Sequence, residues 1–324
     1  MKILRCLLPA ILSGFSLHAQ SEWQRVDSLF GPLPTSVHVY RTTSPIATKP
    51  QSAYYVEAIL DDRSLSFTAD TTSGRRFTPQ QFYDRNGGPL VVVNTSFFSF
   101  ATHQNLNLVM AEGRLLAYNQ HAVAGKGKDT LTWRHALASA IGIDRNRRAD
   151  VAWTFTDSSR TTPLAIQRPL SGWRDSVSLL TKTRLRSRIK SSKVLTGSLR
   201  PWVMHTAVGG GPVLVQSGQR RVTNNEEWKF AGKAIDDRHP RTAMGYTADG
   251  RLIILAVEGR NPGRAEGVTL TELADLLVQL GCIEALNLDG GGSSCLLVNG
   301  MPTIRVSDKE GQRPVPGVFL IRRN

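Results

Sequence analysis

The chain has 324 residues, an apolar content of 40% and a formal net charge of +14 at pH 7. This length provides one large or two ordinary domains with enough chain to bury a core, which excludes a disordered or fibrous protein. The excess of Lys and Arg attracts anions, but the chain carries no aromatic-rich basic motif of a nucleic-acid-binding domain. We therefore expect a sugar phosphate or an anionic glycan as the partner, and no nucleic acid.

Residues 1–19 have the pattern of a secretory signal peptide. Lys2 and Arg5 make a basic start, and the apolar run from Cys6 to Leu17 is too short to span a bilayer. Ala19 offers a small residue for cleavage. No later run is long and apolar enough for a transmembrane segment. These features predict an exported protein, periplasmic or extracellular.

After the signal, residues 20–50 read as a leader segment with one strand at Ser36–Tyr40, and residues 51–324 as one domain. Alternating patterns predict a strand at Tyr54–Leu60 and hairpins within 106–118 and 136–155. A surface insertion is expected near residues 160–197. It contains a basic run, Thr181–Lys190, that either faces an acidic polymer or forms a solvated surface.

Two further stretches combine apolar runs with polar turns. Leu90–Val93 predicts a buried strand that ends at Asn94, which either caps a turn or serves a site. Gly209, Gly210 and Gly211 form a glycine turn ahead of a strand, without the Lys and Ser/Thr of a nucleotide P-loop. His205, just upstream, is a weak candidate.

Residues 238–260 predict a hairpin whose turn is Asp249-Gly250. Pairing outward from a two-residue turn places Arg241 opposite Glu258, and a slip of one residue keeps both at the same edge. Thr269 to Glu272 then forms a capping box, followed by leucines at helical spacing up to Gly281. The next strand is Ile283–Leu288.

Strand, helix and strand in this order predict a βαβ unit with parallel strands. The expected fold class is therefore α+β, a mixed twisted sheet flanked by helices, with a C-terminal βαβ unit carrying the site. In such a unit the strands' carboxyl ends share one edge, where ligands bind. The helix N-terminus, beginning at Thr269, also lies there and attracts anions.

The second strand runs into Asn287-Leu-Asp289-Gly-Gly-Gly-Ser-Ser294. Side chains alternate along a strand, so Asn287 and Asp289 share a face. Read alone, the three glycines are equally consistent with a plain hairpin turn. Together with the βαβ geometry, the stretch predicts a polar pocket that also contains Glu258, Arg241 and Arg260.

Arginine forks bind phosphate oxygens bidentately, and paired carboxylates suit chemistry at a glycosidic carbon. An ion pair between Arg241 and Glu258 is the structural alternative, and it would keep Glu258 ionised. A divalent cation held by Asp289, Glu258 and Asn287 is a third reading. No cofactor is expected. The sequence leaves open which carboxylate is the acid.

The motifs resemble those of the phosphodiester glycosidase family. The resemblance rests on the Asn287–Ser294 stretch together with five others in order: Asn94–Phe98, Gly209–Pro212, His239–Gly245, Val257–Arg260 and the Thr269–Gly281 helix. The family usually has Asp where this chain has Glu258. The resemblance implies hydrolysis of a sugar–phosphate diester at the anomeric carbon.

The first hypothesis is thus an exported hydrolase that cleaves a sugar-1-phosphodiester bond in a glycan or cell-envelope polymer. The alternative is a non-catalytic glycan- or phosphopolymer-binding protein on the same fold. The expected catalytic residues are Asp289 and Glu258. The expected substrate-binding residues are Arg241, Arg260, Asn94, Asn287, Gly210, Gly211, Gly290, Gly291, Gly292, Ser293 and Thr269.

Cys282 and Cys295 flank the last strand and its glycine turn. If the chain reverses at that turn, Cys295 lies near Leu288 rather than Cys282. We therefore expect two free, buried thiols, although an oxidising compartment permits a disulfide.

Overall fold

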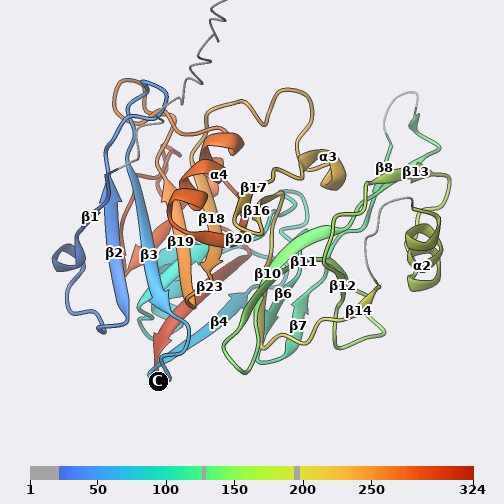
Figure 1. The fold of residues 1–324 in the computed structure, drawn as a ribbon, viewed down its shortest axis with the longest axis horizontal. Coiled ribbons are helices and arrows are strands. Elements are labelled where there is room, and N and C mark those ends of the chain that lie inside the picture. Colours follow the sequence, from blue (N-terminus) through green and yellow to red (C-terminus); the bar gives the residue numbers. More distant parts are fainter. Residues whose placement is uncertain (1–21, 126–128, 193–197) are drawn as a thin grey trace, which may run out of the picture.

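The computed structural model describes residues 22–125, 129–192 and 198–324. The predicted signal peptide lies outside these residues. Strands hold 38% of the residues and helices 13%, and the strands form four sheets, which Figure 1 shows side by side. Within the described ranges, no helix has the length and apolar content needed to cross a membrane.

The largest sheet has eight strands and contains the edge where the site was predicted. Its order is β1 (Gln24–Arg25), β2 (Val37–Thr42), β3 (Ala53–Ile59), β19 (Arg251–Val257), β18 (Arg241–Thr247), β20 (Cys282–Asn287), β16 (Val213–Gln216) and β17 (Gln219–Arg220). Residues of the predicted leader thus form β1 and β2 at the margin of this sheet.

The second sheet has seven strands: β14 (Arg200–Pro201), β12 (Leu164–Ile166), β11 (Ala149–Phe155), β10 (Ala138–Ile143), β15 (Thr206–Gly209), β6 (Val109–Ala111) and β7 (Arg114–Ala117). The five-stranded sheet contains β22 (Met301–Pro302), β21 (Leu296–Val298), β5 (Val91–Asn94), β23 (Gly317–Arg323) and β4 (Leu65–Thr71). The smallest contains β13 (Trp173–Asp175), β9 (Trp133–His135) and β8 (Ala122–Ala124).

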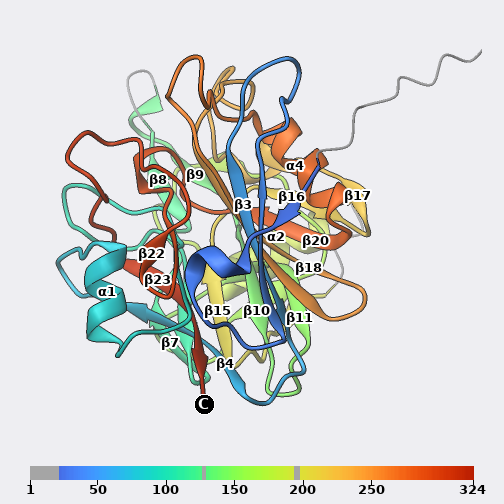
Figure 2. The same ribbon diagram turned by 90° about the vertical axis from the view of Figure 1, so that its left-hand side faces the viewer.

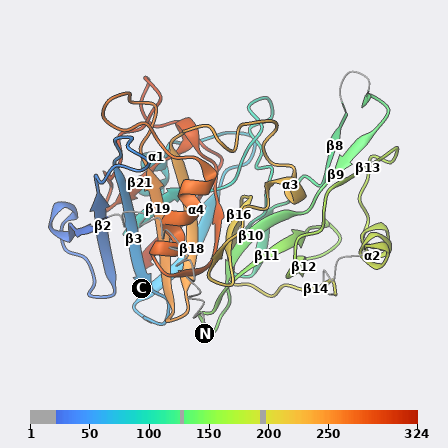
Figure 3. The ribbon, with the colours of Figure 1, turned by 45° about the horizontal axis from the view of Figure 1, so that its top comes forward.

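The helices are short and few in the described part of the chain. They are α1 (Pro79–Arg85), α2 (Lys182–Ser191), α3 (Asn224–Glu227) and α4 (Leu270–Gln279), with 3-10 turns at Asp27–Phe30 and Gly291–Ser293. Figure 2 shows α1 and α4 on opposite sides of the molecule with the sheets between them. In Figure 3, α4 lies across the eight-stranded sheet.

The α+β prediction with a βαβ unit is wrong. The predicted strand, helix and strand form as β19, α4 and β20, but β18 lies between the two strands and pairs antiparallel with both. Every strand pairing described is antiparallel. The apolar runs suggested helix-covered parallel strands, but sheets packed on both sides bury the same runs without helices.

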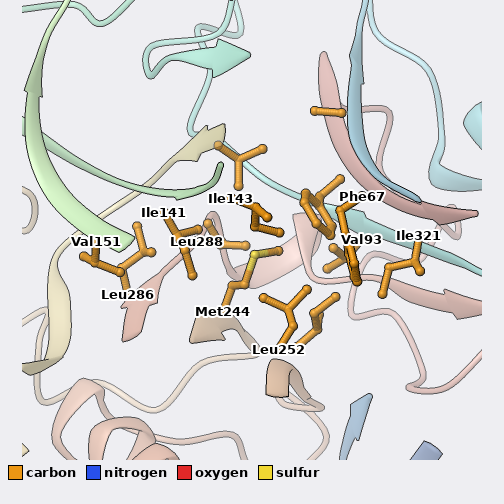
Figure 4. Close-up of a cluster of buried hydrophobic side chains, with 14 of the residues drawn as sticks. Phe67, Val93, Ile141, Ile143, Val151, Met244, Leu252, Leu286, Leu288 and Ile321 are labelled. Atoms are coloured by element: carbon orange, nitrogen blue, oxygen red, sulfur yellow. The ribbon is translucent and has the colours of Figure 1, made fainter. Parts of the chain in front are cut away.

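The main core fills the space between the sheets. Met244 and Leu286 of the eight-stranded sheet meet Ile141 of the seven-stranded sheet and Val93 and Phe67 of the five-stranded sheet, as Figure 4 shows. Each such side chain contributes about 1.5–3 kcal/mol by leaving water. The opposite face of the eight-stranded sheet is covered by α4, whose leucines pack there as their spacing predicted.

The β18–β19 hairpin differs from the prediction by one residue. Arg241 pairs with Val257, not with Glu258, because three residues rather than two connect the strands. Gly250 adopts φ +83°, the left-handed conformation that closes a three-residue hairpin loop. Since side chains alternate along a strand, this slip puts Glu258 on the face opposite Arg241.

Candidate functional site

Three strand termini meet at one end of the eight-stranded sheet. Arg241 begins β18, and Glu258 follows the end of β19. β20 ends at Asn287, beside Ala243 of β18, and leads into Asp289. Antiparallel pairing through β18 therefore brings these termini to one edge. The sequence predicted the same edge, but from the parallel strands of a βαβ unit.

Asn94 links this edge to the five-stranded sheet. Its Oδ1 accepts hydrogen bonds from Thr242 Oγ1 (2.9 Å) and the Cys295 N–H (3.1 Å), and its Nδ2 donates to the Asp289 carbonyl (2.6 Å). The Asp289 N–H in turn donates to the Thr95 carbonyl at 2.8 Å. The fully buried Asn94 amide therefore fixes the backbone that presents the Asp289 carboxyl.

Asp289 is partly buried, with protein packed densely around its carboxyl. Burial raises the pKa of Asp289 to about 6, against the lowering effects of the Ser293 hydroxyl, Arg313, the Gly290 N–H and Lys229. Ser293 Oγ lies close to the carboxyl without full hydrogen-bond geometry. A carboxyl with a pKa near neutrality changes protonation in the working range of acid–base catalysis.

Arg241 is a buried guanidinium held by backbone carbonyls. Nε donates to the Val268 carbonyl (3.2 Å) and Nη2 to the Asp237 carbonyl (2.9 Å), and the group lies over the Phe230 ring. Burial and the nearby Arg260 lower the pKa of Arg241 to about 10. Within the described ranges, no ion pair joins Arg241 to a carboxylate.

Arg241 interacts electrostatically with Asp237 but forms no ion pair with it among the described residues, so the charge of the buried guanidinium is only partly offset. A second cation, Arg260, adds to that charge rather than offsetting it. The imidazole of His239 is also close, and burial, Arg241 and Arg260 all lower its pKa, which favours the neutral ring. This corner of the site is therefore suited to an anion such as phosphate.

The glycine turn connects the anion corner to Asp289. A β-carbon would lie 2.9 Å from the Pro240 carbonyl oxygen at Gly290, 3.0 Å from Arg260 Nη2 at Gly291, and 2.1 Å from Arg313 Nη2 at Gly292. Arg313 also forms a bidentate ion pair with Asp308. The glycines are needed here because the turn passes directly against these groups.

Glu258 is buried but does not join either Arg241 or Asp289 in a described hydrogen bond. Its Oε2 accepts from the Arg305 N–H (3.2 Å), and its Oε1 lies 3.4 Å from Asn261 Nδ2 and 4.0 Å from Arg264 Nε. The Arg241–Glu258 ion pair, the structural alternative that the sequence left open, is absent among the described residues because the two side chains leave opposite faces of the sheet. The catalytic role of Glu258 stays a prediction.

The helix N-terminus is closed by its own side chains. Thr269 Oγ1 accepts from the Glu272 N–H (3.1 Å), and Glu272 Oε2 accepts from the Thr269 N–H (2.9 Å), which completes the predicted capping box. Arg238 pairs with the other oxygen of Glu272. The structure thus places Thr269 beside the site with its hydroxyl already occupied.

Asn287 carries an unused acceptor. Its Nδ2 donates to the Gly211 carbonyl at 3.0 Å, but its Oδ1 is buried with no partner among the described residues. The Ser293 and Ser294 hydroxyls are buried and unpartnered in the same part of the chain. Unpartnered buried polar atoms next to a carboxyl and a glycine turn mark a place for a polar ligand or water.

Sequence reasoning missed Lys229, Glu227 and Arg313. The glycine turn at 209–211 identifies the first two indirectly: a β-carbon on Gly211 would lie 2.4 Å from Glu227 Oε2 and 2.8 Å from Lys229 Cε. A β-carbon on Gly210 would lie equally close to the Asn287 carbonyl oxygen, at 2.4 Å. These glycines make room for site groups.

Glu227 and Lys229 differ in their hydrogen bonding. Glu227 accepts hydrogen bonds from Trp153, Val213, Thr223 and, twice, from Ser139, so it is a structural carboxylate. Lys229 Nζ lies 4.7 Å from the centre of the Phe97 ring and 3.5 Å from Asn107 Oδ1. Burial lowers the pKa of Lys229 to about 8, against the effects of Glu227 and Asp289.

Other predicted features lie elsewhere or outside the site's chemistry. His205 lies at the far end of the seven-stranded sheet, near the β10–β11 turn. Cys282 and Cys295 are free and buried, as expected. Among residues 22–125, 129–192 and 198–324, no cluster of three or more His, Cys, Asp or Glu side chains is arranged to hold a metal.

Comparison with known proteins supports the family resemblance. Residues 170–322 match the model of a family described as phosphodiester glycosidase. The chain resembles the phosphodiester glycosidase family, as its motifs predicted. The human N-acetylglucosamine-1-phosphodiester alpha-N-acetylglucosaminidase is 38% identical over 96 residues, which are 29% of this chain and 18% of the human protein.

A second similar protein is the SPbeta prophage-derived uncharacterized protein YomE of Bacillus subtilis (strain 168), 37% identical over 95 residues. That match covers 29% of this chain and 14% of YomE. The matched segments therefore span less than a fifth of the curated relatives' lengths.

Solved phosphodiester glycosidase and related structures share the fold. The zebrafish N-acetylglucosamine-1-phosphodiester alpha-N-acetylglucosaminidase catalytic domain, auto-inhibited by its pro-peptide, has a TM-score of 0.57 and 18% identity, with 94% of this chain and 89% of that chain covered. A hypothetical protein from Synechocystis has a TM-score of 0.58 and 16% identity, covering 89% of this chain and 62% of that chain. At these identities the likeness establishes the fold alone.

Proposed function

We propose that this protein is an exported hydrolase that cleaves a sugar-1-phosphodiester bond in a glycan or cell-envelope polymer. The observation that carries the proposal is the pairing of two features along one glycine turn. Arg241 and Arg260, which form no ion pair among the described residues, lie against Gly290 and Gly291, and the Asp289 carboxyl, with its pKa raised to about 6, directly precedes these glycines. The family resemblance supports the same reaction class.

In the proposed reaction the phosphate binds at Arg241 and Arg260, and the anomeric carbon lies near Asp289. The bond between the anomeric carbon and the phosphate oxygen breaks, and its electron pair stays on the oxygen. Water supplies the hydroxyl of the released sugar and the proton that is lost. The products are a free sugar and a phosphomonoester.

The leaving phosphate determines which protonation state of Asp289 is active in the proposed reaction. A phosphomonoester anion is a far weaker base than a sugar alkoxide, and two guanidiniums stabilise its charge, so its departure needs no proton donor. Asp289 then acts as the carboxylate, whether it removes a proton from water or attacks the anomeric carbon itself. Activity should fall as the pH drops below about 6, the pKa of Asp289.

The remaining predicted residues serve the same reaction in this proposal. Asn94 holds the Asp289 backbone, and Asn287 Oδ1 with the Ser293 hydroxyl bind hydroxyls of the sugar. Glu258 stays the proposed second carboxylate, as the sequence predicted, and its Oε2 accepts a hydrogen bond from the Arg305 N–H. Export is proposed from the signal pattern of residues 1–19.

The test is hydrolysis of UDP-N-acetylglucosamine, a soluble nucleotide sugar whose anomeric carbon bears a further substituted phosphate, measured as release of the free sugar. Wild type should turn the substrate over, whereas Asp289→Asn should lose about three orders of magnitude in kcat, in the range for loss of an essential catalytic group. Arg145→Gln, an exposed arginine on the β10–β11 turn, is the matched surface control.

The second candidate function is non-catalytic glycan binding on the same fold. It is favoured by the basic surface and by the unpaired arginines, which would bind anions without cleaving them. Binding of the substrate by wild type without release of free sugar, across a panel of sugar-1-phosphodiesters, would establish this alternative and refute the hydrolase.

A further inference from the structure

A second hollow lies beyond the reaction site, between β9, β13, α2 and the segment after α3. It has a volume of about 810 Å³, and arginine and tryptophan side chains dominate its lining. These elements project to the right of Figure 1, away from the eight-stranded sheet. We name this hollow the Arg–Trp groove, defined by Arg134, Trp173, Arg174, Arg188 and Trp228.

Trp228 is held in a fixed position in the groove. Its backbone has φ +50°, an unusual conformation for a bulky residue. Gly172 makes room for the indole, because a β-carbon there would lie 2.8 Å from Trp228 Cδ2. The guanidiniums of Arg134 and Arg174 lie 5.1 and 5.8 Å from the centre of the Trp228 ring. Ring and guanidiniums thus form one ordered surface.

Trp173 forms the other aromatic wall. It stacks on His135 with ring centres 5.2 Å apart, and its Nε1 donates to Asp175 at 3.1 Å. Arg188, from the basic run that the sequence singled out, lies 5.5 Å from the centre of the Trp173 ring. Arg188 Nε is buried and has no hydrogen-bond partner among the described residues. The basic run therefore supplies a side chain to the wall of the groove and is not only a solvent-exposed segment.

The charges around the groove do not cancel. Arg174 pairs with Asp129 at 2.9 Å, and Asp175 is occupied by Arg184 and His135. Glu226 lies 3.9 Å from Arg221. In the part of the chain that the structure describes, neither Arg134 nor Arg188 forms an ion pair, and no acidic residue lines the groove. An anionic ligand is the complement of this surface.

The groove adjoins a smaller cavity on the side of the reaction site. This cavity has a volume of about 330 Å³ and shares Arg134, Trp228 and Phe230 with the groove. Lys229, which also lines the cavity, interacts electrostatically with Asp289. Phe230 lies under the Arg241 guanidinium. Lys229 and Phe230 thus connect the groove and the adjoining cavity to Asp289 and Arg241.

We propose that the Arg–Trp groove binds the chain of an anionic glycan, with carboxylate or phosphate oxygens at Arg134 and Arg188 and sugar rings against the indole edges. The assignment of this chain as part of the substrate rests on the proposed hydrolase function; the binding itself does not. The groove makes the enzyme selective for a charged polymer over a small sugar phosphodiester.

Binding of a short oligogalacturonate to wild type tests the groove without turnover, because this ligand contains no phosphodiester. Calorimetry should detect binding, and the methyl-esterified form of the same oligosaccharide should bind about tenfold more weakly, which is about 1.4 kcal/mol. A phosphorylated malto-oligosaccharide distinguishes phosphate from carboxylate as the preferred anion. Equal binding of the charged and esterified forms would overturn the proposal.

The variant Arg134→Gln/Arg188→Gln should weaken oligogalacturonate binding by at least about tenfold. Arg145→Gln, on the far turn of β10 and β11, should leave the binding unchanged. Thermal melting verifies that the double variant is folded, and Arg134→Lys/Arg188→Lys, which keeps the charges, should retain most of the binding. Unchanged binding by the folded glutamine variant, or tighter binding of single-stranded DNA than of oligogalacturonate, would refute the glycan groove.

If the hydrolase proposal holds, the double variant should raise KM for a polymeric substrate and leave kcat on UDP-N-acetylglucosamine unchanged. If the hydrolase proposal fails, oligogalacturonate binding still decides whether the groove exists. The two proposals therefore fail separately.

Discussion

Replacing Asp289 with asparagine should remove activity and, above pH 6, stabilise the folded protein. Burial raises the pKa of Asp289 from 3.8 to about 6, so keeping this group ionised in the folded state costs free energy. Asparagine has the same shape and can still accept the Gly290 N–H, but it carries no charge. The buried carboxylate thus lowers the free energy of unfolding of wild type, and the asparagine variant lacks this destabilisation.

The size of the stability difference follows from the pKa shift of Asp289. A raised pKa of about two units corresponds to about 3 kcal/mol in the free energy of unfolding. Because the folded pKa lies above the unfolded one, the penalty is absent below pH 3.8, grows as the pH rises and is complete above about pH 6. The stability difference between Asp289→Asn and wild type should follow this curve.

Urea unfolding of wild type and Asp289→Asn at pH 4, 5, 6, 7 and 8 measures this difference directly. Asp249→Asn is the matched control, because the Asp249 pKa is lowered by the Thr247 hydroxyl and Arg251, and the exposed carboxylate should lose stability on neutralisation instead. A stability difference for Asp289→Asn that does not change with pH, or that has the opposite sign at pH 8, would show that the Asp289 carboxyl is not desolvated.

Three further predictions concern the same site. The kcat/KM of wild type should fall about tenfold for each pH unit below 6, because Asp289 is needed as the carboxylate; a rise toward acid pH would assign it the acid role instead. Arg241→Lys should weaken inhibition by inorganic phosphate about tenfold, since an ammonium cannot reproduce the bidentate fork, and an unchanged inhibition constant would exclude Arg241 from the phosphate site. Gly292→Ala should destabilise the fold by about 1–3 kcal/mol in urea unfolding, because its β-carbon would meet Arg313 and Asp308 at 2.1 Å. Gly218→Ala, at a glycine with φ +72° and nothing within 4 Å of its β-carbon, measures backbone strain without a contact, a strain that Gly292 does not carry because its φ is not positive.

The position of Glu258 in the structure differs from the position that the sequence pattern predicted. The sequence paired it with Arg241, and a loop of three residues instead of two moved it to the other face of the sheet. If Glu258→Gln keeps kcat within about threefold of wild type, the second-carboxylate role is refuted; a loss comparable to that of Asp289→Asn would support it.

Local features were predictable because they depend on neighbouring residues. The α4 capping box, the leucine spacing, the hairpins and the buried strand ending at Asn94 all follow from patterns within a few turns of chain. The fold class was not, because continuous apolar runs cannot distinguish helix-covered parallel strands from antiparallel sheets that cover each other. Lys229 and Arg313 carry no local signal and approach Asp289 only through long-range packing.

The sequence by itself determined the family resemblance, the termini that form the site edge and the glycine turn that follows Asp289. The tertiary structure decided which charges are paired. Arg241 forms no ion pair with Glu258 because strand register, set by one residue in a loop, sends Glu258 to the opposite face. Burial, which depends on the packing of distant segments, then raises the pKa of Asp289 and makes its carboxyl the reactive group of the proposed site.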